Sequence, residues 1–107
     1  MNTEAWRREI SEAATQAAVI GVVKRFVDAL DQVEINELPV QCRPTRIGTA
    51  QDIAHWAFTL AKASLSSEED QGVLREVSLV FAEGSSRIAQ LALGRSVRTI
   101  SHPVLGK

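Results

Sequence analysis

The spacing of apolar residues along stretches without proline is the strongest constraint on how this chain can fold. The three prolines stand at positions 39, 44 and 103, and apolar residues recur every three or four positions through most of the rest. That period is typical of amphipathic helices. Hydrophobic residues make up 45% of the 107 residues and charged residues 23%, which suits one folded core. We therefore expect an all-α fold, a bundle of three main helices.

The first expected helix, residues 4–33, carries two apolar faces that do not match. At about 100° per residue, its second half places several valines and Phe26 in one arc. Trp6 and Ile10 fall on the opposite side, so the apolar stripe shifts by about half a turn near residue 18. One straight helix cannot bury both faces. Either it kinks or breaks within Ala18–Gly21, which gives a fourth helix, or its N-terminal half packs against a partner.

A second copy of the protein would be the simplest cover for the displaced stripe, through a two-fold interface. Exposed contiguous apolar area usually marks a contact with a partner. Leu79, on the outer side of a later helix, joins the set. The candidate partner interface is therefore Trp6, Ile10, Ala13, Ala17 and Leu79.

Residues 34–48 are the least periodic stretch and are interpreted as a connecting loop. Thr49 and Asp52 form a start similar to a capping box, which predicts a second helix to about residue 64. Its apolar face is broad and consists of Ile53, Trp56, Ala57, Leu60, Ala61 and Leu65.

A third helix is expected from about residue 66 to residue 93. Gly84 falls inside its apolar arc without changing the phase, so a continuous helix is favoured over a break followed by a short fourth helix. Gly94 is a natural C-terminal stop, which leaves 95–107 as an irregular, basic C-terminal tail on a bundle domain of residues 1–94. The periodicity places Phe26, Leu60, Val77 and Phe81 in the core.

The charge and the cysteine content restrict location and partners. The net charge is −1, so no global field draws the chain to nucleic acid or to an anionic membrane. The single cysteine, Cys42, has no partner for an intramolecular disulfide, and the first residues lack a signal-peptide pattern. The longest apolar run, residues 17–23, is too short to span a bilayer. We expect a soluble, cytoplasmic protein.

Few residue combinations point to chemistry. Asp52 and His55 have the spacing of half a helical metal site, but the other ligands are missing and His55 lies on the polar face. Arg43 beside Cys42 could lower the pKa of the thiol, yet no spacing supplies a base for a nucleophile. The six glycines are scattered, so no phosphate-binding loop is present. We expect no cofactor, no metal and no enzymatic activity.

The C-terminal part of the chain is basic, because no acidic residue follows Glu83. Together with the loop, it gives a candidate basic patch of Arg43, Arg46, Arg95 and Arg98. Such a patch could hold a phosphate backbone, although tight binding of nucleic acid needs more cations than these. The sequence thus favours a non-catalytic helical protein–protein interaction or regulatory module that forms a homodimer, with a nucleic-acid-associated protein as the alternative.

Overall fold

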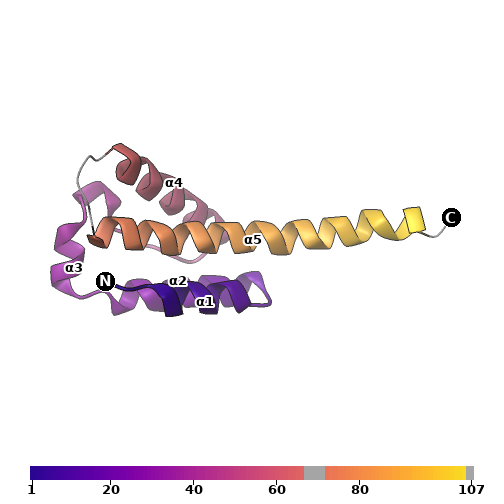
Figure 1. Cartoon of the computed structure of the whole chain (residues 1–107), viewed down its shortest axis with the longest axis horizontal. Coiled ribbons are helices and arrows are strands. Elements are labelled where there is room, and N and C mark those ends of the chain that lie inside the picture. The colour runs from indigo at the N-terminus through magenta and orange to yellow at the C-terminus, as the bar shows by residue number, and fades with distance from the viewer. Residues whose placement is uncertain (67–71, 106–107) are drawn as a thin grey trace.

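The fold is organised around one long helix. The computed structural model describes the backbone of residues 1–66 and 72–105, and the side chains of residues 1–66 and 72–94. In chain order its elements are α1 (Glu4–Glu12), α2 (Gln16–Ala29), α3 (Gln32–Glu37), a 3-10 helix η1 (Val40–Cys42), α4 (Ala50–Ser66) and α5 (Gly72–Leu105). Figure 1 shows α5 along the whole molecule, with α1 and α2 on one side and α4 on the other. The described part of the chain is all-α, as the sequence predicts.

The first predicted helix is broken into a hairpin, α1 and α2. The break lies at residues 13–15, several positions before the predicted Ala18–Gly21. Ala13 ends α1 with extended backbone, and Thr15 begins α2 by accepting a hydrogen bond from the Ala18 N–H at 3.1 Å. Hydroxyl caps of this kind stabilise a helix by about 1 kcal/mol. The fold-back turns the apolar residues of both halves toward α5, which removes the mismatch between the two stripes.

Polar contacts hold α1 against α5 near each end of α1. Thr3 is fully buried, and it donates hydrogen bonds from its N–H (3.3 Å) and its hydroxyl (2.9 Å) to Glu76 Oε1. At the other end, Arg87 Nε donates to the Ala13 carbonyl at 3.0 Å. Because Ala13 ends α1, the guanidinium also meets the negative end of the helix dipole. Ile10 is buried in the core between these two contacts.

Gly84 marks a close approach of α2 and α4 to α5. A Cβ atom there would lie 3.1 Å from Val23 Cγ2 and 3.4 Å from Ile53 Cγ2. α5 nevertheless continues through Gly84, so the prediction of an unbroken helix at this point is confirmed. The predicted core is confirmed too, and its members have little or no exposed surface: Phe26, Leu60, Val77 and Phe81.

The predicted loop between the first two helices contains two short helical elements. Asp31 and Glu34 form a reciprocal capping box that begins α3, with bonds of 2.7 and 2.9 Å. Leu38 and Cys42 then point into the core, with 1% and 0% of their surface exposed. In Figure 1, α3 lies across the end of the bundle from which α5 starts. The segment therefore closes one end of the core as well as connecting two helices.

The expected irregular tail is wrong in the described residues, because the backbone of α5 is helical through Gly94 and as far as Leu105. No glycine among the described residues has a positive φ, so Gly94 does not adopt the left-handed conformation that would end the helix. At about 1.5 Å per residue, α5 is about 51 Å long, close to the longest dimension of the molecule, 58 Å. Its C-terminal part projects past the other helices (Figure 1). The domain boundary predicted at residue 94 falls within this helix and stays a prediction.

Candidate interaction surface

The predicted N-terminal interface is not one exposed stripe. Ile10 has no exposed surface, and Trp6 is half-buried with its ring 5.5 Å from that of Phe26 in an edge-to-face arrangement. Ala13 is half-buried at the end of α1, Leu79 is half-buried on α5, and Ala17 is exposed on α2. Trp6 and Ile10 are therefore used within the chain, and Ala17 is the one member of the predicted interface whose side chain is exposed.

The predicted basic patch divides into two parts. Arg43 donates from Nε to the Leu38 carbonyl at 3.0 Å, so its guanidinium stabilises the turn between α3 and α4. Arg46 is exposed close to the start of α4. Arg95 and Arg98 lie on the projecting part of α5, and their side chains are outside the described residues. Convergence of the four cations, and with it the nucleic-acid alternative, stays a prediction.

Asp52 begins α4 and does not form a pair with His55. Its Oδ2 accepts hydrogen bonds from the N–H groups of Gly48 (2.8 Å) and Thr49 (2.9 Å). The bond from Gly48 is the main cause that lowers the pKa of the Asp52 carboxyl, aided by Thr49 and by the charge of Arg46 against the opposing effect of burial. His55 is exposed, with its ring 5.2 Å from that of Trp56. The carboxylate therefore has a structural role as a helix cap.

Cys42 is a core residue. Its side chain has no exposed surface, and burial raises the pKa of the thiol. The expected lowering of this pKa by the neighbouring Arg43 is therefore wrong, since burial of the thiol raises it. A buried thiol with a raised pKa has little thiolate character and low reactivity.

One side of α4 is an apolar stripe that the rest of the described chain leaves uncovered. Phe58 has 69% of its surface exposed and Leu65 86%, although both belong to a well-packed helix. With Ala54 and Ala61 they recur at intervals of four, three and four residues, so they share one side of α4. The surface of Ala54, Phe58, Ala61 and Leu65 is called the α4 stripe below. Its length and lack of charge distinguish it from scattered surface leucines.

A groove between α4 and α5 continues the α4 stripe toward the projecting part of α5. It has a volume of about 300 Å³, and its lining is mostly small and apolar: Ala50, Gln51, Ala54, Ser85, Ile88, Ala89 and Ala92. Leu93, with 64% of its surface exposed, stands next to it along α5. The α4 stripe and this groove form one continuous surface because they share Ala54.

The sequence interpretation missed this surface for an identifiable reason. The apolar face predicted for the second helix includes Leu65 and omits Phe58. The buried positions of α4, Ile53 and Leu60, are seven residues apart and define the side that faces the core. Phe58 lies well away from that side, and this displacement is the signal that could have identified it.

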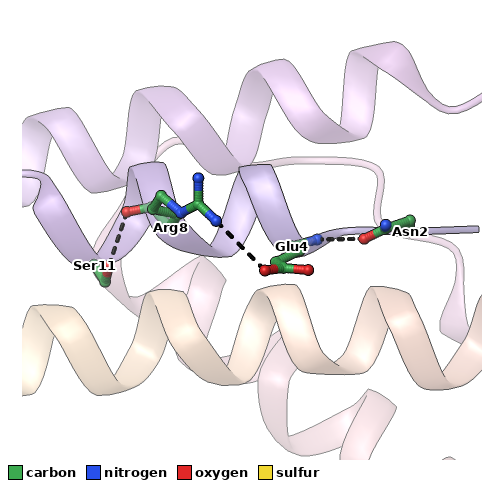
Figure 2. Close-up of polar contacts among 4 residues, drawn as sticks. All are labelled: Asn2, Glu4, Arg8 and Ser11. Atoms are coloured by element: carbon green, nitrogen blue, oxygen red, sulfur yellow. Dashed lines mark hydrogen bonds and ion pairs between the residues drawn. The ribbon is translucent and has the colours of Figure 1, made fainter.

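In two other hollows, several of the lining polar groups already have partners within the chain. One, of about 380 Å³, is lined by Asn2, Glu4, Ala5 and Arg8. Figure 2 shows that Asn2 accepts from the Glu4 N–H, that Glu4 pairs with Arg8, and that Ser11 bonds to the Arg8 carbonyl. The second, of about 450 Å³, is lined by residues of both α1 and α2, where Glu9 pairs with Arg25. These groups stabilise the hairpin and leave little for a ligand to bind.

Comparison of the chain with protein-family models, with curated proteins and with solved structures gave no match. Within the described residues, none of the helices combines the length and the apolar character needed to cross a membrane. The same residues contain no group of three or more potential metal ligands. The function of the protein is therefore inferred from the surfaces described above.

Proposed function

We propose that the chain is a non-catalytic helical protein–protein interaction or regulatory module, that it forms a homodimer, and that it binds through the α4 stripe and the adjoining groove. The observation that supports this is the exposure of Phe58 and Leu65 on one side of a helix whose core side carries the buried residues Ile53 and Leu60. Leaving two large apolar side chains in water costs about 1.5 to 3 kcal/mol each relative to burial. Binding of a partner would recover much of that free energy.

The test is the solution mass of the protein by light scattering over a range of concentrations. Phe58→Asp places a charge in the middle of the α4 stripe and should shift the protein to the monomer. The matched control is Ala17→Asp, since Ala17 is exposed and is the most accessible member of the N-terminal interface predicted from sequence. Loss of the dimer in Ala17→Asp, with Phe58→Asp unaffected, would instead place the interface on the hairpin.

A further inference from the structure

We propose that the occupant of the α4 stripe is α5 of a second copy of this chain. The two copies are related by a two-fold axis near Ile88, and the projecting part of each α5 lies along α4 of the other. This inference rests on the proposed function and deepens it, because it names the occupant, its orientation and its register.

Matching apolar spacing is the first reason. The α4 stripe, Ala54, Phe58, Ala61 and Leu65, has successive intervals of four, three and four residues. The sequence of α5 from the groove outward contains Leu93, Val97, Ile100 and Val104, with the same intervals, on a helical backbone. Such intervals define the seam along which two helices pack in a coiled coil. The chain thus repeats this spacing twice, once on α4 within the bundle and once along the projecting part of α5.

The register of these seams places the two-fold axis. A Cβ atom added at Gly84 would lie 3.4 Å from Ile53 Cγ2, so the two residues face each other. Because α4 and α5 run in opposite directions, Ala54 is then level with Glu83. If Ala54 pairs with Leu93 of the second copy, the axis lies midway between positions 83 and 93, at Ile88. The other three layers of the seam give the same position. A two-fold axis across α5 also makes the second α5 parallel to α4, as a seam in this register requires.

The groove supports this position independently. Ile88 and Ala89 line it, and Ala92 stands one turn further along α5. Where two helices cross, small residues allow their backbones to approach closely, because the interaxial distance depends on the side chains at the contact. The crossing point required by the register is therefore the point where α5 carries small side chains beside an open groove.

The charge distribution favours a second copy over other apolar partners. All thirteen acidic residues precede Gly84, whereas four of the twelve basic residues follow it: Arg87, Arg95, Arg98 and Lys107. In the two-fold arrangement, the basic part of each α5 lies against the portion of the other copy that precedes Gly84, where thirteen acidic residues outnumber eight basic ones. Complementary charge of this kind steers association and selects the orientation.

The size of the surface also requires a reciprocal contact. Stable interfaces bury about 800 Å² per partner and use about 20 to 30 residues a side. The α4 stripe has four residues, so a single helix bound to it falls well short. In the two-fold arrangement each copy contributes its α4 stripe, its groove and its projecting helix, so the contact between stripe and helix is made twice.

The experiment uses a cysteine beside the proposed axis. Ala89→Cys in the full chain is treated with a short bis-maleimide, which should join the two copies because position 89 lies next to the axis in both of them. Native Cys42 has no exposed surface and should not compete. The matched control, Ala17→Cys, is an exposed alanine on the other side of the molecule and should stay monomeric on a denaturing gel. Val97→Asp should weaken dimerisation at least about 30-fold, the effect of removing an interface hot spot.

The outcomes separate this inference from the proposed function. A wild-type dimer in which Ala89→Cys is not joined, or in which Val97→Asp leaves the dissociation constant unchanged, overturns the proposed arrangement while dimerisation itself stands. A wild-type protein that is monomeric at every concentration overturns dimerisation, and the arrangement with it. Joining at Ala89 together with loss of the dimer in Val97→Asp supports both.

Discussion

On one side α5 packs against the α1–α2 hairpin, which buries Ile10 completely, and on the other side it packs against α4, which leaves Phe58 and Leu65 in solvent. The hairpin side also has polar contacts, from Thr3 to Glu76 and from Arg87 to Ala13. Between α4 and α5 the described side chains make apolar contacts and no hydrogen bond. On the hairpin side the large apolar side chains of α1 are buried or half-buried within one chain, whereas on the α4 side Phe58 and Leu65 stay exposed.

The difference follows from the lengths of the helices. α1 has nine residues, and an isolated helix shorter than about 12 to 15 residues is marginal in water. It therefore depends on contacts with α5 for its stability, and the two polar contacts near its ends fix its position. α4 has 17 residues and a broad apolar arc, of which α5 and α2 cover only part. The uncovered part is available to a partner without loss of the bundle.

The largest expected effect tests the hairpin side directly. Ile10→Ala should lower the free energy of unfolding by about 2 to 5 kcal/mol, because it leaves a cavity in a packed core. Phe58→Ala, on the exposed α4 stripe, should change it by less than about 0.5 kcal/mol when the protein is monomeric. Urea titrations of both variants at low concentration measure the two values. Similar losses in the two variants would remove the contrast between the two sides.

A smaller effect is expected at the contact that fixes the end of α1. Arg87→Met should cost about 1 to 2 kcal/mol, because the Ala13 carbonyl loses a charged donor at the negative end of a helix. The control is Arg8→Met, since Arg8 pairs with Glu4 on the surface, where both side chains are about two-thirds exposed. That pair should contribute at most about 0.5 kcal/mol. Unfolding midpoints in urea compare the two, and an equal loss would mean that Arg87 does not fix the hairpin.

The smallest expected effect concerns the start of α4 and depends on pH. The Gly48 N–H and the other groups near Asp52 lower the pKa of its carboxyl in the folded protein. A lowered folded pKa stabilises the fold above the unfolded pKa, about 3.9, and this contribution is lost as the pH falls through the folded value. Asp52→Asn should therefore be less stable than the wild type at pH 6, with a difference that shrinks toward pH 3. A difference that is constant over this range would contradict the role of the charge.

The sequence by itself determined the helical class, the continuity of α5 through Gly84 and the core positions Phe26, Leu60, Val77 and Phe81. Each of these follows from apolar periodicity, which is a local property of the chain. The same periodicity detected the conflict within the first thirty residues but misplaced the break, because a turn at residues 13–15 depends on a cap by Thr15 and a contact from Arg87, far away in sequence.

Only the tertiary structure decided which apolar residues are buried and which are left for a partner. Periodicity gives the width of an apolar arc on a helix, but the part that is covered depends on which neighbours pack against it and at what angle. Ile10 was therefore predicted as a partner surface and is in the core, whereas Leu65 was assigned to the core face and is exposed. The helical backbone of α5 beyond Gly94 was not predicted from sequence either, since glycine and proline there suggest a local end that the helix does not adopt.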